Sequence, residues 1–195
     1  MKLTGRAWKF GDGISTDHIA PGRLFHLRSN LPELAKHVLE DARPEFASEV
    51  REGDFVVGGR NFGQGSSREH APVIIKLAGV SAVIAKSFAR IFFRNCINVG
   101  LPAIILDTDE IEEGDDLEVD LSAGRLVDKT TAKEFTFSPL PPAMAAIVGD
   151  GAGRRTGGQT SSPGKNRFTI AGPRSFIGRF GPGEPDGVDV GEHVT

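Results

Sequence analysis

The chain has 195 residues, of which 38% are hydrophobic and 25% are charged, and these proportions are typical of a soluble globular domain. This length is enough for one sizeable domain but not clearly for two. The formal net charge of −3 argues against the basic surface of a nucleic-acid-binding protein and against a polybasic membrane patch.

The cysteine content and the N-terminal sequence exclude further classes of protein. Cys96 is the one cysteine, so the chain has no internal disulfide, and it cannot alone hold a cysteine-ligated iron–sulfur cluster, which needs three or four thiolates. Residues 1–6 lack the apolar core of a signal peptide, and no stretch approaches the roughly 20 apolar residues of a membrane-spanning helix. We therefore expect a cytoplasmic protein without membrane contacts.

In the first half of the chain, apolar periodicity predicts strands that alternate with loops and helices. The expected order is a strand over 6–10, a polar loop over 11–21, an amphipathic helix over 31–41, a strand over 54–58 and a helix over 73–78. Glycine after 78 and proline at 44 are suitable helix ends.

In the second half, strands become more frequent. The expected order is a strand over 82–85, a helix over 87–97, a strand over 103–106, three short strands over 116–121, 125–128 and 134–137, and a final helix over 140–148. Strand–helix alternation between 54 and 106 predicts an α/β domain with a partly parallel sheet covered by helices. Glycine-rich residues 150–195 have few aliphatic side chains, and we expect a flexible extension after a domain over 1–149.

The segment with the most specific chemistry is 61–71, which reads Asn-Phe-Gly-Gln-Gly-Ser-Ser-Arg-Glu-His-Ala. It lies between a predicted strand and a predicted helix. Glycines allow a ligand to approach the backbone, and the start of a helix presents N–H groups to an anion. Arg68 adds a planar guanidinium that suits a carboxylate or a phosphate.

A simpler interpretation of this segment is a helix cap. Ser66 and Glu69 match the capping box S-x-x-E, although Pro72 favours a helix that begins nearer Ala71 and leaves Ser66 on an irregular turn. The phosphate-loop lysine, the third glycine of a dinucleotide-binding loop and the second glycine of an esterase elbow are all missing.

Three sequence blocks together resemble one known family. Residues 61–72, 11–21 and 83–102 are similar to signatures of the swivelling domain of the aconitase superfamily, and most similar to the separate small subunits of 3-isopropylmalate dehydratase and homoaconitase-like enzymes. The similarity extends over about residues 2–149. Gln64 is a departure, because these small subunits often have cysteine there. The resemblance implies a swivelling three-layer β/β/α domain.

The resemblance also implies a reaction and a set of site residues. The family dehydrates and rehydrates hydroxy acids, which requires a base beside a substrate carboxylate and cations that bind carboxylates. By resemblance, Ser66 is the catalytic base, Asp17 is a second catalytic group, and Ser67 and Arg68 bind substrate. Arg28 lies in a loop that faces the variable group of the substrate in this family, where it would suit an additional carboxylate.

Several residues have ordinary structural interpretations. Asp17 can stabilise a turn, Arg28 can point into solvent, and His70 is expected to support the turn rather than bind a metal. Cys96 is expected to be a buried thiol, and Arg90 and Arg94 are expected to be solvated or ion-paired.

The resemblance places the remaining groups elsewhere. In this family a [4Fe-4S] cluster acts as the Lewis acid, and this chain cannot hold one, so the cluster is expected on a separate large subunit. The chain is then half of an active site for a small hydroxy acid, with 3-isopropylmalate as the leading substrate and leucine biosynthesis as the pathway. A homoaconitase-type subunit is the alternative. A stand-alone anion-binding module and an interaction role through the tail are weaker alternatives.

Overall fold

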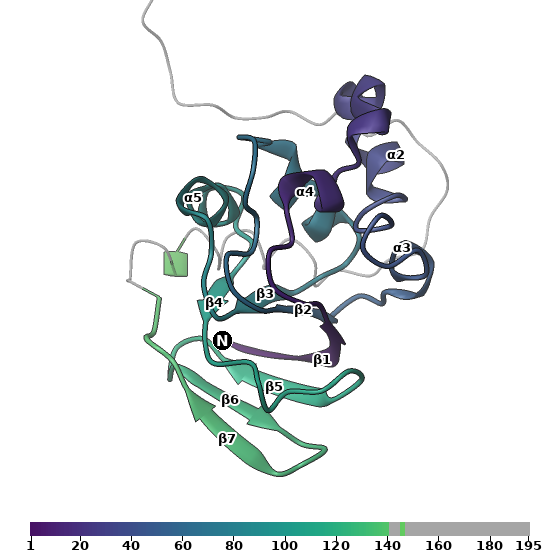
Figure 1. Ribbon diagram of the computed structural model, residues 1–195. Helices are drawn as coiled ribbons and strands as arrows, with labels where there is room; N and C mark the ends of the chain where they lie inside the picture. Colours follow the sequence, from purple (N-terminus) through teal and green to yellow (C-terminus); the bar gives the residue numbers. More distant parts are fainter. Residues whose placement is uncertain (141–144, 147–195) are drawn as a thin grey trace, which may run out of the picture. The chain divides into compact units, whose positions relative to one another are not determined.

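The computed structural model describes residues 1–140 and 145–146, which lie within one compact unit, Met1–Gly158 (Figure 1). The helices of this part are α1 (Thr16–Ile19), the 3-10 helix η1 (Gly22–Ser29), α2 (Leu31–Ala35), α3 (Phe46–Glu49), α4 (His70–Leu77) and α5 (Arg90–Asn98). The strands are β1 (Lys2–Lys9), β2 (Phe55–Gly58), β3 (Ala82–Ala85), β4 (Ala103–Ile105), β5 (Asp116–Asp120), β6 (Arg125–Asp128) and β7 (Lys133–Thr136).

The strands follow the order β4-β3-β2-β1-β5-β6-β7. β1 to β4 are parallel to one another, with Ala7 opposite Phe55 and Val56 opposite Val83. β5 pairs antiparallel with the first half of β1 and continues into the meander of β6 and β7. β1 therefore belongs to both the parallel and the antiparallel parts of the sheet.

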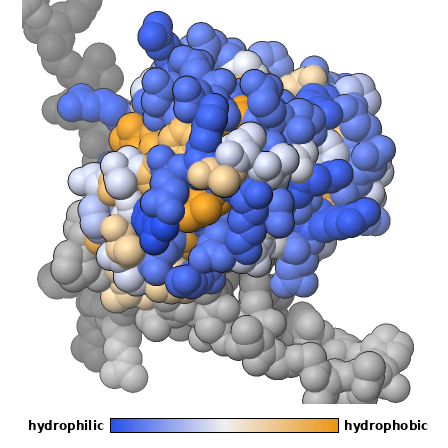
Figure 2. Space-filling model, turned by 90° about the horizontal axis from the view of Figure 1, so that it is seen from below, coloured by the Kyte–Doolittle hydropathy of each residue, from blue (hydrophilic) through white to orange (hydrophobic). Residues whose placement is uncertain are grey.

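Alternation along the parallel strands divides the core into two layers. Val56 and Val83 pack in a cluster with α4 and α5, whereas Phe55 and Ile84 pack in a second cluster with Leu117 and other residues of the meander. Figure 1 shows the helices on one side of β1–β4 and the meander on the other. The three-layer β/β/α arrangement is therefore confirmed. Seen from below, the meander presents mainly hydrophilic residues with small hydrophobic areas (Figure 2).

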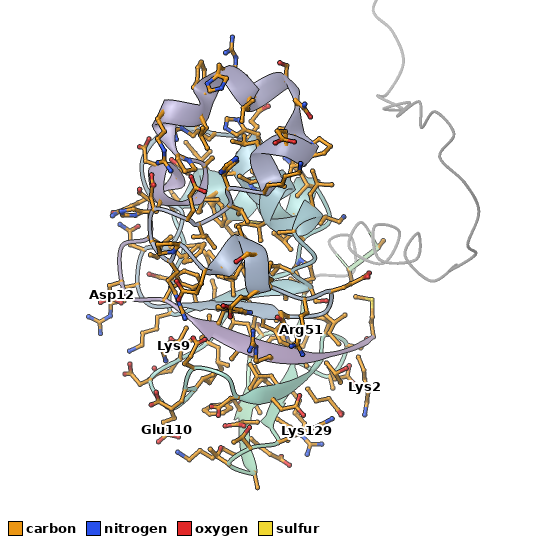
Figure 3. The ribbon with its side chains drawn as sticks, turned by 90° about the vertical axis from the view of Figure 1, so that its right-hand side faces the viewer. Lys2, Lys9, Asp12, Arg51, Glu110 and Lys129 are labelled. Atoms are coloured by element: carbon orange, nitrogen blue, oxygen red, sulfur yellow. The ribbon has the colours of Figure 1, made fainter. Side chains whose placement is uncertain are left out.

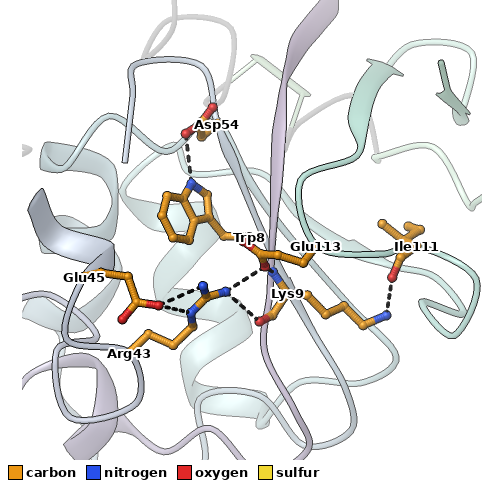
Figure 4. Close-up of polar contacts among 7 residues, drawn as sticks. All are labelled: Trp8, Lys9, Arg43, Glu45, Asp54, Ile111 and Glu113. Atoms are coloured by element: carbon orange, nitrogen blue, oxygen red, sulfur yellow. Dashed lines mark hydrogen bonds and ion pairs between the residues drawn. The ribbon is translucent and has the colours of Figure 1, made fainter. Parts of the chain in front are cut away.

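Side chains at the end of β1 connect these layers (Figure 4). Arg43 forms ion pairs with Glu45 at 2.8 Å and with Glu113 at 2.7 Å, and its guanidinium lies 5.0 Å from the centre of the Trp8 ring. Trp8 in turn donates its indole N–H to buried Asp54 at 2.9 Å. These contacts fix the end of β1 from which the next loop begins.

The carboxyl ends of the parallel strands form the edge that carries the loops of the candidate site. β1 runs from Lys2 to Lys9, and Asp12 lies beyond its Lys9 end (Figure 3). The 59–69 turn follows β2, and residues 86–89 follow β3. Ligands of α/β sheets bind preferentially outside the carboxyl ends of the strands.

Several predicted bounds differ from the structure. The helix predicted over 31–41 is regular only to Ala35 and continues as turns, because the N–H of Leu39 bonds to Ile19 and the φ of Leu39 is 57°. The loop predicted over 11–21 contains α1, and α4 begins at His70 rather than at Val73. Pro72 is tolerated in α4 because it lies in the first turn, where backbone N–H groups have no intrahelical acceptor.

The helix predicted over 140–148 falls mostly outside the described residues, although Ala145 and Ala146 are helical. The extension predicted over 150–195 lies wholly outside them. Among the helices that the structure describes, none is long and apolar enough to cross a membrane.

Candidate active site

Three segments meet at the carboxyl edge of the parallel strands. The N–H of Gly63 donates to Ile14 at 2.7 Å and the N–H of Phe62 donates to Ser87 at 2.9 Å, so the 59–69 turn lies between the loop after β1 and the segment after β3. Thr16 then donates its N–H to Gln64 at 2.7 Å. Main-chain hydrogen bonds thus hold together three segments that are far apart in the sequence.

Two positions in this turn have no room for a side chain larger than that of glycine. Gly63 has φ of 79°, and a Cβ placed on it would lie 2.1 Å from the ring of Phe92. Gly65 has φ of 105°, and its Cβ would lie 3.2 Å from the hydroxyl of Thr16. Both positions combine a left-handed backbone with close neighbours, so the turn brings α1 and α5 against its own backbone.

Ser66 lies at the exposed side of this turn, next to Thr16. The hydroxyl of Thr16, a residue with 2% exposure, donates to the carbonyl of Ser66 at 3.0 Å and lies 3.4 Å from the Ser66 hydroxyl. No other hydrogen bond of the Ser66 side chain occurs in the described part of the chain. The cap of α4 is Glu69, without a side-chain hydrogen bond, so the capping-box interpretation of Ser66 is wrong.

Arg68 and Asp17 are brought together, although 51 positions separate them. One terminal nitrogen of Arg68 donates to the Asp17 carboxylate, and the other donates to the carbonyls of Ala20 and Thr16. Arg68 therefore ties α1 to the turn. Its Nε–H and one further N–H remain available, since a guanidinium has five donors.

Ser67 is exposed, and its side chain makes no hydrogen bond in the described part of the structure. The hydroxyl is therefore free for a ligand that reaches the turn beside Ser66. The roles proposed for Ser66, Ser67, Arg68 and Asp17 remain predictions, but all four residues lie on two adjoining segments.

His18 has a role that the sequence pattern did not indicate. Its ring Nδ1 accepts the N–H of Ser15 at 3.1 Å, and the Ser15 hydroxyl accepts the N–H of His18 at 3.2 Å. This reciprocal capping box stabilises the N-terminus of α1. The serine three positions before His18 is the signal that could have predicted it.

Arg28 lies in η1 and is exposed. Its guanidinium lies 4.3 Å from the centre of the Phe25 ring and donates to the Phe25 carbonyl at 3.2 Å. Its positive charge nevertheless acts on His70, which follows Arg68 by two positions. Arg28 is thus on the same side of the molecule as Arg68, although no contact places it in the site.

The pKa of the His70 imidazole lies below its ordinary value. Partial burial is the largest cause, and the charges of Arg68 and Arg28 lower it further. With its pKa lowered by burial and by these two charges, the imidazole is expected to be neutral at pH 7. It therefore contributes no positive charge to the anion-binding side of the turn.

This shift predicts a pH dependence of stability. Because the unfolded chain binds a proton at His70 more readily than the folded chain, stability falls as the pH decreases below about 6.5, the ordinary histidine pKa. His70→Gln should therefore show a smaller loss of Tm than the wild type between pH 7.5 and 5.5. His26→Gln is the control, and an equal change in the wild type and His70→Gln would contradict the prediction.

A pocket of about 260 Å³ opens beside Ser66. Its lining comes from the turn, from α1 and from the first part of α5. The lining residues are Thr16, Gly63, Gly65, Ser66, Arg68, Ala89, Arg90, Ile91, Phe92 and Asn95. The charged side chains of this lining are those of Arg68 and Arg90.

The contact between Thr16 and Ser66 gives a second prediction. Thr16→Val keeps the shape of the side chain but removes the hydroxyl, whose one proton can turn from the Ser66 carbonyl to a deprotonated Ser66. Loss of one such hydrogen bond, about 1.4 kcal/mol, should lower kcat about tenfold with little change in KM.

Thr16→Ser should restore kcat, since it retains the hydroxyl. The pH profile of kcat should shift upward in Thr16→Val alone, because the alkoxide form of Ser66 becomes less stable. Equal kcat values in Thr16→Val and the wild type would show that the hydroxyl only shapes the turn.

The residues described here do not fit an iron–sulfur cluster. Cys96 is fully buried in α5, and burial raises the pKa of its thiol well above the ordinary value, so a metal-binding thiolate is disfavoured. Within 1–140 and 145–146, no three side chains of the histidine, cysteine, aspartate or glutamate type are grouped to hold a metal ion.

Comparison with known proteins identifies related sequences and one related fold. Residues 29–108 match the family model of the aconitase C-terminal domain. The 3-isopropylmalate dehydratase small subunit 2 of Archaeoglobus fulgidus is 65% identical over 77% of this chain and 92% of its own length. The small subunit 1 of Thermotoga maritima is 64% identical over 75% of this chain and 89% of its own length.

A homoaconitase subunit is also similar. The methanogen homoaconitase small subunit of Methanothermobacter thermautotrophicus is 53% identical over 76% of this chain and 86% of its own length. The crystal structure of 3-isopropylmalate dehydratase from Methanocaldococcus jannaschii superimposes with a TM-score of 0.74 at 46% identity, and it covers 77% of this chain and 90% of that chain.

Proposed function

The chain belongs to the 3-isopropylmalate dehydratase small-subunit family of the aconitase superfamily, and from this we propose that it is the small subunit of a hydro-lyase. The proposed reaction moves a hydroxyl group between adjacent carbons of 3-isopropylmalate by dehydration and rehydration. The observation that carries the proposal is the juxtaposition of Ser66, Arg68 and Asp17 beside a pocket without carboxylates.

In this proposal, Ser66 removes the proton from the carbon beside a substrate carboxylate. A serine hydroxyl is a weak base, so its alkoxide needs nearby donors and positive charge. The Thr16 hydroxyl lies 3.4 Å from that of Ser66, and its one proton can turn from the Ser66 carbonyl to the alkoxide as the alkoxide forms. Arg68, two positions along the chain, supplies positive charge. The exposed position of Ser66 leaves its hydroxyl accessible to substrate.

Arg68 and Ser67 would hold a substrate carboxylate through their free donors. Asp17 keeps the Arg68 guanidinium oriented, and it can exchange this ion pair for a proton-transfer role when substrate enters. The left-handed glycines keep side chains away from the approach to Ser66.

The rest of the active site would come from a large subunit. Because this chain's residues do not fit a [4Fe-4S] cluster, we assign the cluster to that partner and derive no step from it here. Residues 1–149 would form the family domain, and 150–195 an extension to it. The cytoplasmic location and the absence of nucleic-acid and membrane partners also belong to this proposal, and cell fractionation tests the location.

Reconstitution tests the proposal. The full chain is mixed with a cluster-bearing large subunit of the family, and hydration of isopropylmaleate is followed by the loss of its ultraviolet absorbance. We expect turnover by the mixture and none by either subunit alone. A mixture that forms a complex but hydrates no substituted maleate would refute the assignment, and so would turnover by this chain alone.

Homoaconitase activity is the second candidate, because a subunit of that name is 53% identical and Arg28, which forms no ion pair with the residues that the structure describes, acts on His70 through its charge. Homoaconitate has an additional carboxylate that an arginine would bind. If Arg28 binds it, Arg28→Val should lower kcat/KM for homoaconitate relative to isopropylmalate more than tenfold, or about 2 kcal/mol.

Arg23→Val is the matched control for this variant. Arg23 lies in the same helix, but it pairs with Glu40 and with Asp41. An unchanged substrate ratio in Arg28→Val would assign Arg28 to the solvent-exposed surface.

A further inference from the structure

The first turn of α5 forms the wall of the pocket that faces the 59–69 turn. Its cap residue, Ala89, has no side chain that could accept a hydrogen bond. The first intrahelical bond runs from Phe93 to Ala89, and the N–H groups of Arg90, Ile91 and Phe92 have no acceptor in the described part of the chain. Nine residues of helix thus direct an uncapped N-terminus at the pocket.

Asn95 provides an independent indication of a ligand. Its side chain lines the pocket at 7% exposure, and it makes no hydrogen bond to any described residue. Among the described residues, the one buried side-chain polar atom without a partner is Nε of Arg6, so the polar atoms of Asn95 keep access to the pocket and can meet a ligand there. The unpartnered amide of Asn95 lies between the apolar side chains of Phe92 and Cys96 in sequence, where packing alone would favour an aliphatic residue.

Arg90 supplies charge at the same place. It lines the pocket, it is exposed, and it forms no ion pair with the residues that the structure describes. Arg68, across the pocket, already binds Asp17 and two carbonyl groups. Of the two arginines that line the pocket, Arg90 is therefore the one whose guanidinium donors are all free of partners among the described residues.

We propose that the N-terminal turn of α5, together with Arg90 and Asn95, is a carboxylate-binding subsite that faces Ser66 across the pocket. Arg90 and the free N–H groups bind the carboxylate oxygens, and the side-chain amide of Asn95 donates a further hydrogen bond. The occupant is one carboxylate of a dicarboxylic acid whose carbon chain crosses to Ser66.

This subsite deepens the proposed function, on which the identity of the occupant rests. A substrate with two carboxylates needs two anion-binding positions, and Ser67 with Arg68 offers one at the turn. The α5 subsite offers the other, and exposed Ile91 beside it offers an apolar contact for a substituent. The reacting carbon would then be held from both sides.

Binding to the full chain alone tests the subsite without any assumption about turnover. Succinate is titrated into isotope-labelled chain, and the backbone signals of Ile91 and Phe92 and the side-chain amide signals of Asn95 are followed by NMR. These signals should move with a common Kd. Succinamide, which lacks the charge, should move none of them.

Variants then separate a specific subsite from general charge. Arg90→Gln should raise the Kd for succinate about tenfold, equivalent to about 1.4 kcal/mol, and Asn95→Leu should raise it at least as much. Arg94→Gln is the matched control, because Arg94 is exposed on the same helix but does not line the pocket. It should leave the Kd unchanged.

An unchanged Kd in both Arg90→Gln and Asn95→Leu, or an equal rise in Arg94→Gln, would overturn the subsite. In the reconstituted enzyme, Arg90→Gln should raise KM about tenfold and retain kcat. If the wild-type mixture hydrates no substituted maleate while the succinate results hold, the proposed function fails and the anion subsite stands. If the mixture is active but KM is unchanged in Arg90→Gln, the subsite is not used by substrate and the proposal fails.

Discussion

Replacing Ser66 by alanine should reduce kcat of the reconstituted enzyme by about 10³–10⁴-fold, the range of a lost general base. Ser66 is exposed at the pocket, and within the described residues its hydroxyl makes a side-chain hydrogen-bond contact only with Thr16, at 3.4 Å. Removing it opens no cavity in the core. The hydrogen bond from Thr16 to the Ser66 carbonyl should survive, since that acceptor belongs to the backbone.

The measurement is the steady-state rate of isopropylmaleate hydration, with subunit association followed by gel filtration. Association and Tm should match the wild type, so the loss must lie in the chemical step. Ser48→Ala is the control, because that hydroxyl donates to the Glu45 carbonyl far along the chain from the turn. Near-normal turnover in an assembled Ser66→Ala enzyme would remove Ser66 from catalysis.

The strands buried on both faces were predicted most accurately from the sequence. β3 has the predicted bounds, because a short apolar run between turns leaves little freedom. β6 also has the predicted bounds, although its sequence, RLVD, is fully buried on one face only. β1 is longer than predicted. Residues 2–6 join it by pairing with β5, more than 100 positions later, and Gly5 is required there because its Cβ would lie 2.2 Å from the Gly53 carbonyl. The local pattern of apolar residues cannot predict the pairing of residues 2–6 with β5.

The candidate site was predicted from the resemblance rather than from spacing. Neither the ion pair between Asp17 and Arg68 nor the contact between Thr16 and Ser66 follows from local pattern, because both join different loops. Ser87 was predicted to open a helix, but its hydroxyl accepts the N–H of Asn61 at 2.8 Å. α5 therefore begins later, at Arg90, with an uncapped end.

The α5 wall of the pocket was missed because Arg90 and Arg94 have the same local pattern. The structure separates them, since Arg90 lines the pocket and Arg94 does not. Two signals in the sequence could have indicated the difference. Alanine stands at the cap position where serine or aspartate is usual, and Asn95 interrupts an apolar helix face.

Gly63→Ala should destabilise the fold by about 3 kcal/mol and remove the site with it, since left-handed strain and overpacking each cost about 1–3 kcal/mol. The new methyl group would lie 2.1 Å from Cγ of Phe92 in a backbone with φ of 79°. Phe92 cannot move freely, because its ring packs against that of Phe62, with 5.6 Å between the ring centroids. Phe92 also lines the pocket. Chemical denaturation of the full chain measures the loss.

Gly11→Ala is the matched control for this substitution, because a Cβ there meets no atom within 4 Å and the backbone is not left-handed. It should change the free energy of unfolding by less than about 1 kcal/mol. The difference in the free energy of unfolding between the two variants measures the effect of the close approach of the turn to α5, apart from the general effect of replacing a glycine. If Gly63→Ala unfolds at the same denaturant concentration as Gly11→Ala, the turn can move away from Phe92. The two walls of the pocket would then not be held at a fixed separation, and Ser66 would not be positioned by the contact between Gly63 and α5.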